Sequence, residues 1–401
     1  MLRRVFKAFE YRDFRLMWTG ACTSSIGTWM QKLAQSWLVL TISGSPFYLG
    51  LDAFLGDIPI FLFSLVGGVV ADRIDRRRVL LGSQYVQMAC AFLLTFLIAF
   101  KIVKVWHILC LSFVAGLAQA FGGPAYQALI PMLVETKDMP NAIALQSIQF
   151  NVARVLGPVL GGLALTQLGA TWCFALNGVS FIAPITSLLL LNARFMPDKT
   201  VETMFASMKQ GIRFVRRQGA MEALIVLAFL MTAMGVPIMT FLPVFAKDIF
   251  RKGPGTFTLF LSSTGLGSIV GALTMAALGD FSHKGRTALV MLICLGGSIT
   301  GFALSRSIAL SCLFLFISGA ALIGVFTAIN SLVQLIATNQ MRGRVMSVYN
   351  LAFRGGMPMG NLVTGWLVPI FTAPVVLAVN GVLLVVLGLY YVFAKRRVAE
   401  L

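Results

Sequence analysis

The chain of 401 residues is 58% hydrophobic and only 11% charged, with a mean hydropathy of +0.88. A soluble domain typically carries about 25% charged residues, so this composition excludes one and predicts a membrane protein. The net charge of +18 would suggest nucleic acid in a soluble protein. Here the basic residues lie in short loops beside apolar runs, where membrane orientation explains them, and no nucleic-acid partner is expected.

Apolar runs bounded by turn signals predict an all-α membrane protein, since a spanning helix needs roughly 20 mainly apolar residues. Twelve spans in two six-helix halves are expected near 16–41, 47–71, 79–100, 106–131, 142–168, 170–192, 221–246, 256–279, 287–305, 308–336, 345–370 and 373–394. The expected domains are an N-terminal six-helix bundle (1–192), a cytoplasmic linker (193–220) and a C-terminal six-helix bundle (221–401). The basic start runs directly into a span too long for a signal peptide, so the first helix is expected to be retained.

The linker differs from the spans because its apolar residues recur at helical spacing opposite a basic face. That face carries Lys209, Arg213, Arg216 and Arg217. The pattern predicts an amphipathic helix lying on the inner leaflet, with a solvated linker as the alternative.

Lys and Arg are distributed unevenly between the two sides of the membrane. With the N-terminus placed in the cytoplasm, 23 of the 32 fall on the cytoplasmic side, 6 on the opposite side and 3 within spans. Because positive residues gather in cytoplasmic loops, both termini are expected in the cytoplasm.

The six cysteines all fall in apolar runs, with neither CxxC spacing nor clustering. They predict packing residues rather than a disulfide framework or a metal site, and no cofactor is expected. HExxH, GxSxG and P-loop motifs are absent from the sequence, so an enzyme is not expected either.

The two halves look like repeats of one another. ARVLGP at 153–158 has a counterpart 200 residues later in FRGGMP at 353–358, and the charged loop at 72–78 recurs in degenerate form at 280–286. Two six-helix repeats of this kind usually enclose a site at their interface and move against each other.

Several segments resemble the major facilitator superfamily, and the resemblance covers nearly the whole chain. GGVVADRIDRRRVLL at 67–81 is similar to its loop motif GxLaDrxGrkxxl, with Asp75 replacing the internal glycine. ARVLGPVLGG at 153–162 is similar to its antiporter motif gxxxGPxxGG, with Ala153 replacing the first glycine. SIGTWMQKLAQSWLVL, FGGPAYQALIPMLV and RGRVMSVYNLAFRGGMPMG resemble the branch of drug and siderophore exporters that includes the enterobactin exporter.

The loop motif implies a cytoplasmic gate. Its matching residues are Gly68, Asp72, Arg73, Arg76 and Arg77. In the superfamily the loop aspartate docks against the start of the eleventh span, which implies that Asp72 is a latch. A helix starting near Arg344 would attract this carboxylate by about 0.3 to 1 kcal/mol, or about 2 when partly buried. The alternative is that the loop charges only fix topology.

The antiporter motif consists of Gly157, Pro158, Gly161 and Gly162. Proline removes a backbone donor and kinks a helix, and the glycines let another backbone approach closely. A bent, tightly packed fifth span that seals the outer half of the pathway is expected, with plain helix packing as the alternative.

Charged side chains within spans are predicted to serve proton coupling, since each costs roughly 2.5 to 3.5 kcal/mol at a helix centre. Asp57 is the first candidate and Asp52 the second, because competition between a proton and a cation such as Lys32 or Arg154 is a workable coupling device. Lys32 and Asp57 lie equally far from a turn at 44–45, and so at one depth. A permanent Lys32–Asp57 ion pair that only holds the hairpin is the alternative.

Polar residues within spans are predicted to line the substrate cavity, and the first span carries a stripe of them with a period close to 3.6. Some are expected to form hydrogen bonds between helices instead. The cavity candidates are Thr28, Gln31, Gln35, Gln119, Tyr126, Gln149, Asn330, Gln334 and Arg354.

The resemblance implies a secondary active transporter of a bacterial inner membrane. It would export an amphipathic small molecule, a siderophore or a drug, by alternating access and proton antiport. Its expected partners are the substrate, protons and membrane lipid, and it is expected to be a monomer. An importer of a small solute or a lysolipid flippase is the alternative transporter. A channel or a scramblase is the alternative of another class.

Overall fold

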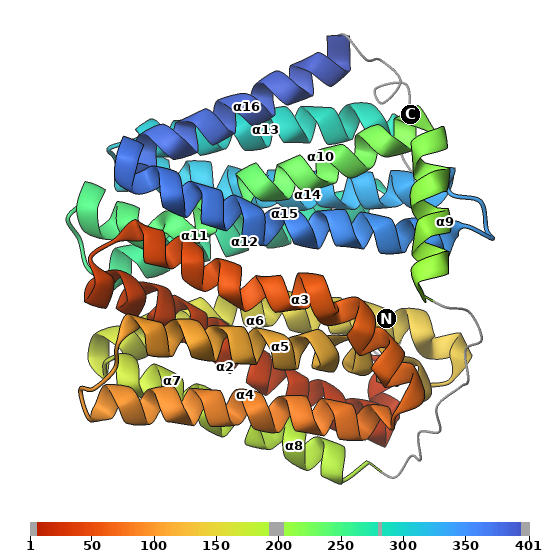
Figure 1. The fold of residues 1–401 in the computed structure, drawn as a ribbon, viewed down its shortest axis with the longest axis horizontal. Coiled ribbons are helices and arrows are strands. Elements are labelled where there is room, and N and C mark those ends of the chain that lie inside the picture. Colours follow the sequence, from red (N-terminus) through yellow and green to blue (C-terminus); the bar gives the residue numbers. More distant parts are fainter. Residues whose placement is uncertain (1–5, 192–203, 280–282, 394–401) are drawn as a thin grey trace. The chain divides into compact units, whose positions relative to one another are not determined.

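The computed structural model describes residues 6–191, 204–279 and 283–393, apart from the side chains of Asp72 and of residues 204–207 (Figure 1). These ranges contain helices and no strand, and ten helical segments in them are long and apolar enough to cross a membrane. α2 (Arg12–Ser43) and α15 (Arg342–Phe371) are also long enough, with 32 and 30 residues, although polar residues make them less apolar. The prediction of an all-α fold with twelve spans is confirmed.

The chain divides into two compact units. Unit 1 comprises Met1–Ser43 and Leu55–Val201, and unit 2 comprises Gly44–Phe54 and Glu202–Leu401. The division falls within α3 (Pro46–Arg73), so the first turns of this helix belong to unit 2 and the remainder belongs to unit 1.

The remaining helices of unit 1 follow the predicted order of spans. They are α4 (Arg76–Ala99), α5 (Val105–Leu129), α6 (Met139–Gln167), α7 (Ala170–Ser180) and α8 (Ile182–Leu189), with the short helices η1 (Lys7–Glu10), η2 (Ile130–Met132) and η3 (Thr136–Asp138). The predicted sixth span corresponds to α7 and α8 together, and its last predicted residue, 192, lies outside the described ranges.

Unit 2 repeats this order after one additional helix. Its helices are α9 (Met204–Arg217), α10 (Gly219–Gly235), α11 (Pro237–Val244), the π-helical turn η4 (Phe245–Ile249), α12 (Pro254–Leu278), α13 (Lys284–Leu304), α14 (Ile308–Ile336), α15 and α16 (Ala373–Phe393). The predicted seventh span corresponds to α10 and α11, which are divided at Pro237, and residue 394 of the twelfth lies outside the described ranges.

The same pairs of spans pack together in both units. The first span packs on the fifth (α2 on α6, α10 on α15), and the third packs on the sixth (α4 on α7, α13 on α16). The second and fourth spans approach closely at glycines in both units. A Cβ atom at Gly116 would overlap the carbonyl group of Gly56, and one at Gly267 would overlap that of Phe316. Small residues allow such close helix packing in membranes.

The turn between α2 and α3 is the one expected from the sequence. α2 ends at Ser43 and α3 begins at Pro46. Gly44 has φ +62°, in the left-handed region that favours glycine, which lets the chain reverse within two residues. Lys32 and Asp57 therefore lie equally many residues from the turn on the two helices.

α9 differs from the spans of unit 2 because it runs across the ends of α10 and α15 rather than alongside them (Figure 1). It contacts the first turn of α15, where a Cβ atom at Gly211 would lie 2.7 Å from the carbonyl oxygen of Arg344. Val215 is buried on the same side of α9. The helix predicted for the linker is therefore present over residues 204–217, while 193–203 lie outside the described ranges.

Candidate functional site

The loop between α3 and α4 provides the N-cap of the third span. The Asp75 carboxylate accepts a hydrogen bond of 2.9 Å from the backbone N–H of Arg77, which makes Asp75 the N-cap of α4. Arg78 lies 3.9 Å from the same carboxylate and is largely exposed. Asp75 replaces a glycine of the loop motif, and glycine and aspartate are both favoured N-cap residues.

Two arginines of this loop bind backbone carbonyl groups at the ends of other helices. Arg76 donates to the carbonyl oxygen of Ala71 in α3 and to that of Ala128 in α5, each at 3.2 Å. Arg77 donates to the carbonyl oxygen of Leu189, the last residue of α8, at 2.8 Å, and to that of Leu191 at 3.2 Å.

The last carbonyl groups of a helix have no partner within the helix, and cations there also favour the helix dipole. Arg76 and Arg77 thus join the ends of α3, α5 and α8 around the start of α4. Below them lies an apolar core that includes Ala71, Leu80 and Leu129.

Of the other gate residues, Gly68 is half-buried within α3, and Arg73 is exposed at its last position. Asp72 lies in the last turn of α3, but its side chain is outside the part of the chain that the structure describes. The latch role of Asp72 stays a prediction. The degenerate second copy of the loop, 280–286, also falls partly outside the described ranges.

Residues 7–11 are held against the start of α6 beside this loop. Asp138 accepts a hydrogen bond of 2.8 Å from the Tyr11 hydroxyl and pairs with Lys7 at 3.1 Å. The side chain of Asn141 accepts a hydrogen bond of 2.9 Å from the backbone N–H of Ala8. Burial raises the pKa of the Tyr11 hydroxyl above its ordinary value, and the hydrogen bond to Asp138 raises it further. Sequence patterns did not indicate this cluster, because the two segments that form it lie more than 120 residues apart in the chain.

The antiporter motif packs directly against α2. A Cβ atom at Gly157 would overlap the side chain of Trp29, and one at Gly161 would lie 2.9 Å from the Cα atom of Met30. Pro158 and Gly162 are buried in the same helix. The glycines therefore let α6 approach α2 within unit 1, which is the close helix packing expected of this motif. Its role in sealing the pathway stays a prediction.

The Trp29 ring has two cations near it at this contact. The Lys32 amino group is 5.3 Å from the centroid of the indole ring, and the Arg154 guanidinium carbon is 6.0 Å from it. Phe150 meets the same ring edge-on, with the centroids 6.2 Å apart. Both cations stand near the middle of helices of 32 and 29 residues. This group of Trp29, Lys32, Phe150 and Arg154, called the Trp29 cluster below, presents positive charge and aromatic surface within the membrane.

The two acidic coupling candidates are both half-buried on α3, but they belong to different units. Asp57 lies in unit 1 with Lys32 and Arg154, whereas Asp52 belongs to the first turns of α3, which are part of unit 2. Their role in proton coupling stays a prediction.

Three of the predicted cavity residues bond to neighbouring helices of unit 1. The Gln31 side chain accepts a hydrogen bond from Asn177 of α7. Gln35 donates one of 2.9 Å to Ser112 of α5. Gln149, which is buried, donates one of 2.8 Å to Ser25 of α2. These side chains hold helices together, as the sequence predicted for some of the set, and a contact with substrate stays a prediction.

Other cavity candidates bond within their own helix or to polar neighbours. The Thr28 hydroxyl donates to the carbonyl oxygen of Ser24 at 2.8 Å. Gln119 is exposed and accepts a hydrogen bond of 3.3 Å from Gln87. Tyr126 is half-buried against the core below the loop.

In unit 2, two cavity candidates bond to each other on α14, and a third lies on α15. Gln334 is exposed and donates a hydrogen bond of 2.6 Å to Asn330. Arg354 is exposed near the middle of its helix. Their contact with substrate stays a prediction.

Comparison with known proteins places the chain in a family. A family model described as transmembrane secretion effector matches residues 5–400. The chain belongs to the transmembrane secretion effector family. This is a family of the major facilitator superfamily, which confirms the resemblance seen in the motifs, and its members are transporters rather than enzymes.

Relatives of known function are similar over most of the chain. A staphyloferrin A transporter of Staphylococcus aureus is 24% identical, over 93% of this chain and 94% of its own length. The multidrug efflux pump Tap of Mycolicibacterium fortuitum is 26% identical, over 86% of each chain. An enterobactin exporter of Salmonella typhi is 25% identical, over 94% of this chain and 90% of its own length.

Solved structures share the fold. A peptide transporter superposes with a TM-score of 0.77 at 14% identity, covering 96% of this chain and 95% of its own. A bacterial homologue of the lysosomal transporter Spinster superposes with a TM-score of 0.76 at 13% identity, covering 96% and 97%. At these identities the likeness shows the major facilitator fold alone.

Proposed function

We propose that this transporter exports an amphipathic small molecule, a siderophore or a drug-like compound, from the bacterial cytoplasm by alternating access coupled to proton antiport. In support, the relatives similar over most of the chain include both siderophore transporters and drug efflux pumps. We also propose that the protein acts as a monomer. Both termini would lie in the cytoplasm, and the bias of basic residues supports this orientation.

The observation that carries the choice of substrate is the Trp29 cluster. Lys32 is exposed although it lies near the middle of a spanning helix. A charge facing lipid at that depth costs roughly 2.5 to 3.5 kcal/mol, so its exposed side is better explained by a water-filled pathway. The same reasoning applies to Arg354, which is exposed near the middle of α15.

A pathway lined in this way suits a substrate that carries anionic oxygen groups together with a ring or another apolar part. The cations would attract the anionic groups, and the indole ring would receive the apolar part, since aromatic side chains combine large apolar area with defined geometry. Siderophores with acidic groups have this chemistry.

Transport into inverted membrane vesicles tests the proposal. The expected result is accumulation of an acidic siderophore that needs a proton gradient and stops when an uncoupler dissipates it. Lys32→Gln should raise the apparent KM about fivefold, which corresponds to about 1 kcal/mol of lost attraction. The control is Trp172→Leu, because Trp172 is exposed on α7 and lies outside the Trp29 cluster.

Other outcomes would favour the alternatives. Flux that persists in both directions after the gradient is dissipated would identify a channel or scramblase. Accumulation in right-side-out vesicles alone would identify an importer. A Lys32→Gln variant with an unchanged KM for an acidic substrate would remove the Trp29 cluster from recognition.

A further inference from the structure

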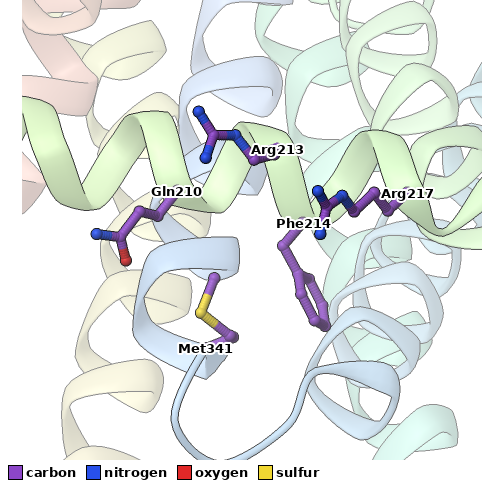
Figure 2. Close-up of a pocket in the computed structure, with 5 residues that line it drawn as sticks. All are labelled: Gln210, Arg213, Phe214, Arg217 and Met341. Atoms are coloured by element: carbon purple, nitrogen blue, oxygen red, sulfur yellow. The ribbon is translucent and has the colours of Figure 1, made fainter.

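A pocket lies between α9 and the turn that precedes α15, all within unit 2. It has a volume of about 160 Å³ and is lined by Gln210, Arg213, Phe214, Arg217 and Met341. The four α9 residues recur at positions i, i+3, i+4 and i+7, so they share one face of the helix. In Figure 2 the guanidinium groups of the two arginines lie toward one edge of this group, and the Phe214 ring and the Met341 side chain lie toward the other.

The surroundings of the pocket are basic. No acid occurs in the α9 sequence MFASMKQGIRFVRR, or in TNQMRGR at 338–344 on the other side of the pocket. Arg213 and Arg217 are exposed, and within the part of the chain that the structure describes neither is paired with an acidic side chain. The pocket therefore has positive charge that the described protein does not neutralise.

The position of α9 places the pocket beside anionic groups of the membrane. Because α9 runs across the ends of spanning helices α10 and α15, it lies at the level of the membrane surface (Figure 1). Gly211 and Val215 fix one side of it against α15. Phospholipid headgroups occupy this level, and anionic lipids are attracted by basic segments there. The planar guanidinium group of an arginine matches the oxygens of a phosphate in geometry as well as in charge.

We propose that this pocket binds one anionic phospholipid, with its phosphate held by Arg213 and Arg217 and its glycerol and upper acyl chain against Phe214 and Met341. Gln210 can donate to a remaining phosphate oxygen. The bound lipid would join α9 to the turn before α15, since the lining residues come from both. This proposal does not depend on the transported substrate or on proton coupling.

The test is lipid binding to the full-length protein in detergent, measured by native mass spectrometry during titration with phosphatidylglycerol. The pocket variant is Arg213→Gln/Arg217→Gln. The matched control is Lys209→Gln/Arg216→Gln, which removes the same charge from the same helix at positions that do not line the pocket. Phosphatidylglycerol should bind the pocket variant about tenfold more weakly than the control, because bidentate contacts add to simple attraction.

Further measurements determine whether the bound phosphate belongs to a lipid or is a free anion. Phosphatidylcholine, whose phosphate is neutralised within the headgroup, should bind wild type and both variants alike. Inorganic phosphate at millimolar concentration should leave phosphatidylglycerol bound, because it lacks the apolar contacts. An Arg213→Lys/Arg217→Lys variant keeps the charge without the planar fork, and its affinity should fall between those of wild type and the glutamine variant.

The proposal is overturned if the pocket variant and the control lose affinity equally, since α9 would then attract lipid only through its total charge. It is also overturned if inorganic phosphate displaces the lipid, since the pocket would then hold a free anion. Unfolding midpoints in phosphatidylcholine confirm that each variant is folded before its affinity is compared.

Discussion

Arg77 donates a hydrogen bond of 2.8 Å to the carbonyl oxygen of Leu189, and so connects the start of the third span to the end of the sixth. A second bond from the same guanidinium group reaches Leu191. The bridge lies wholly within unit 1, and it gives a loop arginine a structural task in addition to orienting the chain in the membrane.

Replacing Arg77 should therefore loosen unit 1. We expect Arg77→Gln to lower the free energy of unfolding by about 1 kcal/mol, since the bonds are charge-assisted but partly exposed. Arg78→Gln is the matched control, because Arg78 is largely exposed and lies 3.9 Å from Asp75. Thermal unfolding of the purified variants in detergent checks this, and equal midpoints would show that the carbonyl bridge contributes nothing measurable.

The N-cap role of Asp75 predicts an unusual order of stability among its variants, with glycine less harmful than alanine. Asp75→Ala should cost about 1 kcal/mol of stability, because it leaves the N–H of Arg77 without its side-chain partner. Asp75→Gly should cost only a few tenths of a kcal/mol, and it restores the residue of the superfamily motif. Chemical denaturation of the three proteins measures the order. A glycine variant as unstable as the alanine variant would argue against the capping role.

Close packing of the antiporter motif makes Gly161 sensitive to a single methyl group. Gly161→Ala places a Cβ atom 2.9 Å from the Cα atom of Met30, a backbone atom that cannot rotate away. We expect a loss of about 1 to 3 kcal/mol. Gly82→Ala on α4 is the control, since a Cβ atom there meets no atom within 4 Å and alanine favours a helix. Unfolding midpoints that fall equally for both would contradict the packing role.

Removing the Asp138 carboxylate should release the start of the chain. Asp138→Ala deletes the acceptor of the Tyr11 hydroxyl and the partner of Lys7. Hydrogen exchange of the backbone amides of residues 8–11 should then accelerate, while exchange in α4 stays unchanged. Glu222→Gln is the control, because Glu222 is exposed in the first turn of α10 in unit 2. Unchanged exchange in Asp138→Ala would mean that other contacts hold this segment.

Coupling is tested by comparing the two acids of α3. If Asp57 carries the proton, Asp57→Asn should abolish uptake driven by a pH gradient into inverted vesicles, while substrate binding persists. Asp52→Asn should retain most of the uptake. The measurement is proton-driven uptake at matched protein amounts, and normal uptake by Asp57→Asn would exclude Asp57 from coupling.

Apolar periodicity predicted the spans and the turn at Gly44 because membrane helices must hide their backbone from lipid, which makes length and hydropathy sufficient signals. The limits of this signal appear at Gln31 and Gln149. A polar stripe faces either a cavity or a neighbouring helix, and period alone does not distinguish them. The structure pairs Gln31 with Asn177 and Gln149 with Ser25.

Other features depend on contacts between distant residues. The carbonyl acceptors of Arg76 and Arg77 lie up to 114 residues away in the chain, so the sequence indicated a gate or a topological role for these arginines and not their carbonyl partners. Asp75 did carry a readable signal, since an aspartate directly before a helix start is a favoured N-cap. Trp29 and Lys32 carried another readable signal, since residues three apart on one helix are neighbours on its surface.

The acceptors of Arg77, at the end of α8 and just after it, are backbone oxygens, and this has a genetic consequence. No substitution of Leu189 or Leu191 removes a main-chain carbonyl group. A random mutagenesis screen for loss of this bridge should therefore recover changes at Arg77 and none that act by deleting an acceptor. Compensating charge swaps, which reveal ordinary ion pairs, will fail to reveal this one.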